Sequence, residues 1–223
     1  MPAYAFTWRY SLNKADKNVL TGRAAEVRPF YVMELLARAG QLEAEGRSVL
    51  HLEVGEPDFP TPQPIIDAGI RALRQLKTHY TPALGLPELR QSIAAYYQQK
   101  FNVEIDARRV IVTPGASGAL QLALSVLVDT GDNVLLTDPG YPCNPNFVRR
   151  LDAEPQFIPV NAEDNYQLTA ELVASHWQDN TVGVMVASPS NPTGEVISRD
   201  NLLALHQEVS GRGGSLVVDE IYH

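Results

Sequence analysis

A carboxylate and a tyrosine follow an apolar stretch at the end of the sequence. Ser215–Val218 is predicted as a short buried strand, and Asp219 comes directly after it in the segment DEIY. An ionised carboxylate taken out of water needs a cation or N–H donors as partners. A protonated ring nitrogen of a heterocycle would meet that need, and so would an arginine of the fold. Tyr222 adds a hydroxyl three residues further on.

A turn of small residues follows a second apolar stretch. Val110–Thr113 is predicted as a strand, and PGASG leads from it into a helical pattern at Ala116–Val128. Small residues let an anion approach the backbone, and the first turn of a helix offers free N–H groups at its positive end. Gly115, Ala116 and Ser117 therefore form a candidate phosphate cup, with a tight turn that binds nothing as the alternative. The segment matches neither G-x-x-x-x-G-K-[ST] nor G-x-G-x-x-G.

Two more loops carry an aromatic ring and an amide. TDPGYPCNP places Tyr141 among turn-forming residues, where an aromatic side chain can stack on a flat ring. SPSNPTG restricts its backbone with two prolines, and Asn191 in it offers both a hydrogen-bond donor and an acceptor. Ordinary packing of the tyrosine and a plain turn around the asparagine are the alternatives.

These loops all follow apolar runs that alternate with helical patterns. The alternation indicates parallel strands with helices on both faces, an α/β fold of three αβα layers. Ligands bind beyond the carboxyl ends of such strands, so the four loops are expected to meet at one edge of a sheet. The predicted strands are Val110–Thr113, Val134–Thr137, Gln156–Val160, Val182–Ala187 and Ser215–Val218.

The region before this sheet is less regular. Residues 1–28 are predicted as an arm, Phe30–Gly46 as a helix and Val49–Glu53 as a short strand. Two further helical patterns follow, the second from about Pro87 to Lys100. The predicted domains are residues 1–48, an arm with a helix, and residues 49–223, which carry the four loops.

Composition excludes several functional classes. The 223 residues carry a net charge of −8, which disfavours nucleic acids and anionic membranes as partners. No apolar stretch approaches the ~18 residues of a membrane span, and the start lacks the pattern of a signal peptide. Cys143 is the single cysteine, so a reducing cytoplasm fits best. The five histidines are scattered without ligand spacing, and no metal is expected.

A phosphate cup, an aromatic ring, an amide and a carboxylate at one sheet edge suit a flat, phosphorylated ring that contains nitrogen. Pyridoxal 5′-phosphate (PLP) has this chemistry, and its ring nitrogen is commonly held by an acidic residue. From about Arg28 to the last residue, the sequence also resembles the class I/II aminotransferases of the PLP-dependent fold type I, aspartate aminotransferase-like superfamily. The resemblance is carried by GEPDFPTP, HYTPALGLPELR, TPGASGALQLAL, DPGYP, SPSNPTG and DEIY.

The resemblance implies a role for each matched residue around the cofactor. Ala116 and Ser117 match the phosphate cup, and Tyr141 matches the aromatic residue stacked on the ring. Asn191 matches the amide that hydrogen-bonds the ring oxygen O3′. Asp219 matches the carboxylate that keeps the ring nitrogen protonated.

The remaining matches concern O3′, the neighbouring subunit and the substrate. Tyr222 matches the tyrosine that also contacts O3′. Tyr80 matches a residue that reaches the phosphate in the neighbouring subunit, which implies a homodimer. Gly55 matches a backbone contact to the substrate carboxylate, and Asn191 is implied to bind substrate as well as cofactor. The implied substrates are an amino acid and a 2-oxo acid. Residues 1–48 then include a piece of the family's small domain, and residues 49–223 belong to its PLP-binding large domain.

One expected residue has no match. The family uses a lysine some tens of residues beyond DEIY that forms a Schiff base and shuttles a proton. The four lysines of this sequence, Lys14, Lys17, Lys77 and Lys100, lie in none of the corresponding positions. The sequence is therefore expected to be the N-terminal part of an aminotransferase, inactive by itself and with an incomplete sheet.

Three other readings stay open. A lyase or synthase of the same superfamily carries the same motifs. A non-catalytic chain that binds PLP without a covalent bond has the same fold. A nicotinamide-binding Rossmann domain is disfavoured, because TPGASG stands where such a domain has G-x-G-x-x-G.

Overall fold

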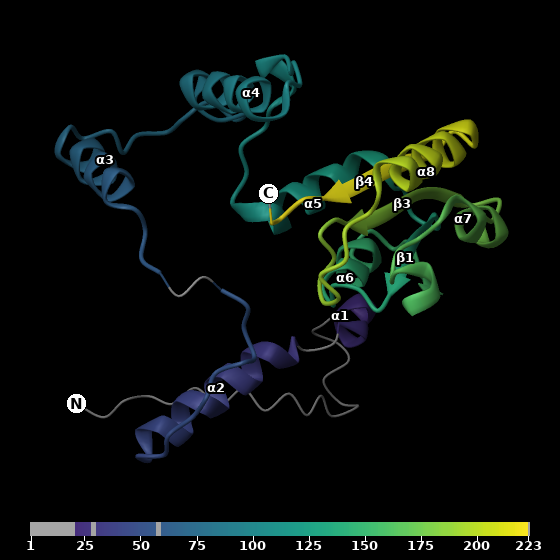
Figure 1. The fold of residues 1–223 in the computed structure, drawn as a ribbon, viewed down its shortest axis with the longest axis horizontal. Coiled ribbons are helices and arrows are strands. Elements are labelled where there is room, and N and C mark those ends of the chain that lie inside the picture. The colour runs from purple at the N-terminus through teal and green to yellow at the C-terminus, as the bar shows by residue number, and fades with distance from the viewer. Residues whose placement is uncertain (1–20, 28–29, 57–58, 223) are drawn as a thin grey trace. The chain divides into compact units, whose positions relative to one another are not determined.

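The computed structural model describes residues 21–27, 30–56 and 59–222. They form two compact units (Figure 1). One contains the described part of residues 1–30 together with residues 124–222, and the other contains residues 31–123. No helix within these described ranges is long and apolar enough to cross a membrane.

The first unit is built on a parallel sheet of four strands. The strands are β1 (Asn133–Asp138), β2 (Glu154–Pro159), β3 (Thr181–Ala187) and β4 (Ser215–Asp219). Their order is β2-β1-β3-β4, and all neighbours run parallel. The carboxyl ends of the strands therefore lie at one edge. The predicted α/β fold with a parallel sheet is confirmed.

Helices connect these strands. They are α6 (Asn144–Arg149), α7 (Ala170–His176) and α8 (Arg199–Gly211), with the short turn η3 (Ala162–Asp164) before α7. The Thr169 hydroxyl accepts the N–H of Leu172 at 3.3 Å, and the Ser198 hydroxyl accepts that of Asn201 at 3.2 Å. These side chains satisfy N–H groups that the first turns of α7 and α8 would otherwise leave free.

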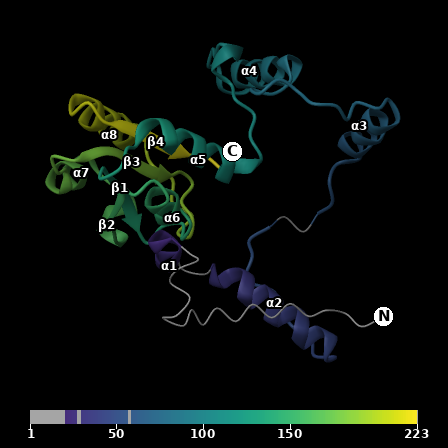
Figure 2. The ribbon, with the colours of Figure 1, turned by 180° about the vertical axis from the view of Figure 1, so that it is seen from behind.

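Both faces of the sheet are covered, as three layers require. On one face, Leu135 and Val184 belong to a buried cluster with Leu205 of α8. On the other face, Val134 and Met185 line a small apolar cavity with the end of α5 (Gly115–Leu127). α7 and α8 lie side by side against the sheet, as the two opposite views in Figures 1 and 2 show. Because β1 is buried on both faces, its centre, Val134–Leu136, is apolar without alternation.

The described N-terminal residues of this unit include one short helix, α1 (Gly22–Glu26). Arg23 of α1 donates hydrogen bonds from Nη1 to the Arg150 carbonyl oxygen at 2.9 Å and to Asp152 Oδ2 at 3.0 Å. Both acceptors lie in the turn directly after α6. The helix is thus tied to the segment that follows Tyr141.

The second unit contains α2 (Tyr31–Ala44), α3 (Gln63–Arg74), α4 (Pro87–Phe101), η2 (Ala107–Arg109) and the first residues of α5. Arg90 of α4 donates to the carbonyl oxygens of Val110 and Ala107, each at 2.8 Å. These bonds tie α4 to the segment that leads into α5. On α3, by contrast, Ile65, Ile70 and Leu73 are all exposed.

Two predicted strands are wrong. The structure assigns no strand to Val49–Glu53 or to Val110–Thr113. A strand persists only when its N–H and C=O groups pair with a neighbour, and none of the four described strands pairs with either segment. Leu50 and Leu52 are accordingly 89% and 93% exposed. The predicted domain boundary after residue 48 stays a prediction.

Candidate cofactor site

A small pocket lies at the carboxyl ends of β1 and β3. Its volume is about 70 Å³, and its walls come from the ends of these strands, the loops that follow them and the start of α6. Tyr141 and Asn191, predicted from two separate loops, both line it. The parallel topology explains this meeting, because both loops leave the sheet at the same edge.

The loop between β1 and α6 passes close to its own strand. A Cβ atom on Gly140 would lie only 2.6 Å from the carbonyl oxygen of Thr137. Real Cβ atoms essentially never come so near to a backbone oxygen, so this position requires glycine. Gly140 thereby sets the path on which Tyr141 follows, and the peptide bond between Asp138 and Pro139 is cis.

The loop after β3 is fixed by its own hydrogen bonds. The peptide bonds Ser188–Pro189 and Asn191–Pro192 are cis. The Ser188 hydroxyl accepts the N–H of Ile197 at 3.0 Å, and the N–H of Ser190 donates to the Glu195 carbonyl oxygen at 2.8 Å. Ser188 and Ser190 are buried, so these bonds are shielded from water. Asn191 is thereby held at a set position beside the pocket.

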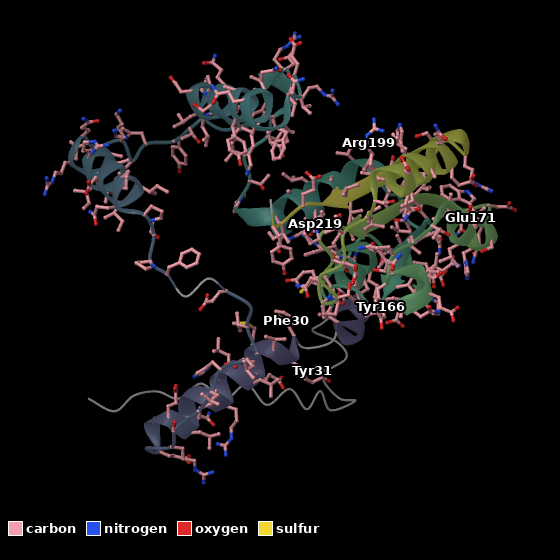
Figure 3. The ribbon with its side chains drawn as sticks, in the orientation of Figure 1. Phe30, Tyr31, Tyr166, Glu171, Arg199 and Asp219 are labelled. Atoms are coloured by element: carbon pink, nitrogen blue, oxygen red, sulfur yellow. The ribbon has the colours of Figure 1, made fainter. Side chains whose placement is uncertain are left out.

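Asp219 ends β4 next to this loop. It pairs in register with Ala187, which lines the pocket, and its carbonyl oxygen accepts the N–H of Ser188 at 3.0 Å. Figure 3 labels Asp219 at the end of β4. Partial burial raises the pKa of its carboxyl group above the ordinary 3.8, and a hydrogen bond from the backbone of Ile221 opposes this effect. The carboxylate is thus poorly solvated where a cationic partner would stabilise it.

The pKa of Tyr141 is shifted by the groups around it. Its pKa is raised to about 12, first by a hydrogen bond between its hydroxyl and the Cys143 side chain and then by burial. The charges of Cys143, Asp219 and Tyr222 raise it further. Asp219 and Tyr222 thus act on Tyr141 electrostatically. Tyr222, in the turn after β4, keeps more than half of its surface exposed.

The other four predicted site residues belong to the second unit, and none of them lines this pocket. Ala116 and Ser117 lie in the first turn of α5, after Gly115 with a φ of +74°. The residues before this turn form no strand, so the turn is not the strand exit that the sequence predicted, and the phosphate cup stays a prediction. Tyr80 is fully exposed, and Gly55 lies in an exposed irregular segment.

Two residues beside the pocket were not predicted. Asn144 begins α6 and lines the pocket; its Oδ1 is buried and has no hydrogen-bond partner among the described residues. The ring of Phe30 meets the ring of Tyr141 edge to face, with centroids 5.9 Å apart and planes at 80°. Asn144 offered a weak signal, as a polar residue three positions after Tyr141. Phe30 offered none, because its contact joins segments far apart in the sequence.

Within the described parts of the chain, no three His, Cys, Asp or Glu side chains gather in a group that could hold a metal ion. The candidate site combines an aromatic ring, amides and a carboxylate. This set can stack a flat ring, hydrogen-bond its substituents and balance a positive charge on it.

The chain is similar in sequence to proteins of a known family. Residues 47–223 match the family model described as aminotransferase class I and II. The chain is 41% identical over 205 residues to the (5-formylfuran-3-yl)methyl phosphate transaminase of Methanocaldococcus jannaschii, covering 92% of this chain and 52% of that protein. The chain spans about half the length of the curated relatives it matches.

Solved structures agree. The crystal structure of an aminotransferase from Mycobacterium tuberculosis superposes with a TM-score of 0.88 at 36% identity, covering 92% of this chain and 52% of that one. The aspartate aminotransferase from Thermus thermophilus with maleate gives a TM-score of 0.86 at 32% identity, covering 91% and 53%. Sequence and fold thus lead to one conclusion: the chain belongs to the class I and II aminotransferase family.

Proposed function

We propose that the full-length protein is a PLP-dependent aminotransferase that moves an amino group from an amino acid to a 2-oxo acid. Family membership supports the reaction class. The observation that carries the proposal is Asp219, a partly buried carboxylate with a raised pKa beside a pocket lined by Tyr141 and Asn191. The relatives' names share amino-group transfer and differ in substrate, so the proposal is confined to the reaction class.

The residues present fit PLP. A protonated ring nitrogen would offset the cost of desolvating Asp219. The face of Tyr141 is proposed to stack on the ring, and Asn191 and Tyr222 to hydrogen-bond O3′. Ala116 and Ser117, in the first turn of α5, are proposed to bind the phosphate through backbone N–H groups at the positive helix end.

When bound, PLP supplies an electron sink for the bond broken at the substrate Cα. Asp219 holds the proton on the ring nitrogen, which keeps that sink effective. The backbone at Gly55 is proposed to bind the substrate carboxylate and so to orient Cα. The four lysines lie outside the matched motifs. We therefore propose that the group exchanging protons at Cα comes from sequence beyond residue 223, and that residues 1–223 alone are inactive.

The proposal extends to assembly and location. A homodimer is supported by Tyr80, whose side chain is fully exposed in its unit and thus available to a neighbouring subunit. A cytoplasmic location is supported by Cys143, the single cysteine, which is free. The division of the chain into a small-domain piece up to residue 48 and a large domain from residue 49 belongs to the same proposal.

The experiment uses the full-length gene product. Incubation with PLP and borohydride is expected to give a stoichiometric covalent adduct by mass spectrometry, and amino-acid mixtures are expected to yield transamination products. Asp219→Asn should lower kcat/KM about ten- to a hundredfold, as expected for loss of a charge-assisted hydrogen bond. Asp200→Asn, in the exposed first turn of α8, is the matched control.

Two outcomes contradict the proposal. PLP that washes off after borohydride treatment would indicate non-covalent binding by a protein without catalysis. A covalent adduct that releases ammonia or eliminates a side-chain group without amino transfer would indicate a lyase of the same fold.

A further inference from the structure

The N-terminal residues of the first unit contact the Tyr141 region at two points. Arg23 reaches the turn directly after α6, and Phe30 reaches Tyr141, just before α6. The two contacts bracket α6, whose start lines the pocket. Neither Arg23 nor Phe30 belongs to the residues matched to the family's motifs.

The Arg23 contact anchors the segment. Its guanidinium donates to the Asp152 carboxylate at 3.0 Å and to the Arg150 carbonyl oxygen at 2.9 Å. Both charged side chains are about half exposed, so the pair is a modest tie rather than a rigid one. The two acceptors lie in one turn, so both bonds join α1 to the end of α6.

The Phe30 contact is specific in geometry. The two rings stand at 80° with centroids 5.9 Å apart, the edge-to-face arrangement that aromatic quadrupoles favour. The Cys143 side chain interacts with the Tyr141 hydroxyl strongly enough to be the largest cause of its raised pKa. The ring contact with Phe30 is the one that fixes an angle for the Tyr141 ring. Figure 3 labels Phe30 where the described N-terminal segment meets α2.

We propose that Phe30 is a positioning residue for Tyr141, which holds the tyrosine ring at the angle needed to stack on a flat cofactor ring. The inference rests on the proposed PLP binding and adds a residue to it. Tyr141 is only partly buried, so without Phe30 its ring would sample further rotamers. Cofactor binding would then have to order that ring, at a cost in affinity.

The test compares three variants of the full-length apoprotein. Phe30→Leu keeps apolar volume but removes the ring, Phe30→Tyr keeps the ring, and Tyr31→Leu alters a neighbouring aromatic that is 63% exposed. Titration with PLP is followed by absorbance, and the bound cofactor by its visible circular dichroism. Phe30→Leu should raise the dissociation constant about two- to tenfold and weaken the dichroic band. Phe30→Tyr and Tyr31→Leu should stay near wild type.

A double-mutant cycle separates positioning from general packing. In a Tyr141→Leu background, Phe30→Leu should weaken PLP binding no further, because the ring it positions is gone. The melting temperature of each apoprotein should likewise change non-additively. Equal weakening in both backgrounds would overturn the proposal, and so would wild-type affinity in Phe30→Leu when the wild type binds PLP. A wild-type protein that binds no PLP at all would instead refute the proposed function.

Discussion

Asp219 ends β4 as a carboxylate that the folded protein solvates poorly. Its raised pKa means that, above pH 3.8, the folded protein retains the proton more readily than the unfolded chain. Its contribution to stability is therefore fullest below pH 3.8 and is lost as the pH rises through the raised pKa. A cationic ring nitrogen reverses this, because it favours the ionised carboxylate.

This reversal gives a pH prediction for cofactor binding. The affinity of the full-length protein for PLP should fall as the pH drops through the raised pKa of Asp219. Asp219→Asn should bind PLP more weakly and lose that part of the pH dependence. Titration of PLP at a series of pH values measures both, with Asp200→Asn expected to follow the wild-type profile. An unchanged profile in Asp219→Asn would show that another group governs the pH dependence.

Gly140 controls the path of the loop that carries Tyr141. Gly140→Ala should destabilise the folded protein by about 1–3 kcal/mol, because the new Cβ would press on the carbonyl oxygen of Thr137. Urea unfolding of the full-length protein measures this, and PLP binding should weaken in parallel. Gly211→Ala, where a Cβ meets nothing within 4 Å, is the control and should be close to neutral. Equal stability of the two variants would contradict the prediction.

The sequence predicted which residue types lie at the candidate site, but it did not predict how their side chains pack. Tyr141 and Asn191 were predicted because turn formers follow apolar runs, and the structure places both at one pocket. Asn144 and Phe30 were missed for a physical reason. Their roles depend on tertiary contacts. Asn144 lies at the start of a helix and lines the pocket, and Phe30 contacts Tyr141 across more than a hundred residues of sequence.

At the scale of elements, apolar segments of the sequence were predicted as strands. Only those segments that pair with a neighbouring strand are strands in the structure. β1 and β3 appeared as expected, because each lies between two neighbours and is covered on both faces. Val110–Thr113 is equally apolar, yet no described strand pairs with it. A local sequence pattern indicates that a segment favours the β conformation, but it does not indicate whether a neighbouring strand is present to pair with it.

The ion pair between Arg23 of α1 and Asp152, in the turn after α6, is expected to make a small, salt-sensitive contribution to the free energy of unfolding. Arg23→Ala should lower the free energy of unfolding by at most about 1 kcal/mol, since both partners are half exposed. Urea unfolding at low and high salt should show the difference shrinking as salt is added. Asp152→Asn is the matched variant, because asparagine tolerates the φ of +57° at that position. A salt-independent loss would assign the effect to packing of the arginine stem instead.

His51 links the end of α2 to the segment after it. Its Nε2 lies 3.0 Å from Glu43 Oε1 and its Nδ1 lies 2.6 Å from Glu53 Oε1. The hydrogen bonds with Glu43 and then Glu53 raise the pKa of His51 above 6.5, and His51 lowers the pKa of Glu53 below 4.5. The contribution of His51 to the stability of this contact is full below pH 6.5 and disappears as the pH rises through the raised pKa of His51. The Glu53 contribution is full above pH 4.5 and disappears on acidification.

Amide exchange at the C-terminal end of α2 should therefore be slowest between about pH 4.5 and 6.5, after correction for the intrinsic pH dependence of exchange. His51→Gln should remove this window, while His206→Gln, in α8, should leave it intact. A window that survives in His51→Gln would show that the ionic cluster does not hold α2 to the following segment.

At the scale of the whole molecule, the residues that the structure describes leave several large apolar side chains exposed. Leu50, Leu52 and one face of α3, with Ile65, Ile70 and Leu73, are exposed. We expect a polypeptide of these 223 residues to bind a hydrophobic dye strongly and to aggregate, and the full-length protein to do neither. Dye fluorescence and light scattering of both proteins test this. A sharp, cooperative unfolding transition of the shorter polypeptide with little dye binding would contradict it.

The strand order β2-β1-β3-β4 sets a possible order of events on the ribosome. β1 emerges first and becomes an interior strand; β2 then joins one side of it, β3 the other side, and β4 the free side of β3. No pair among these four ever has to separate to admit a later one. The nascent chain can thus build this sheet outward from β1 as synthesis proceeds, and complete these pairings once Asp219 has left the exit tunnel.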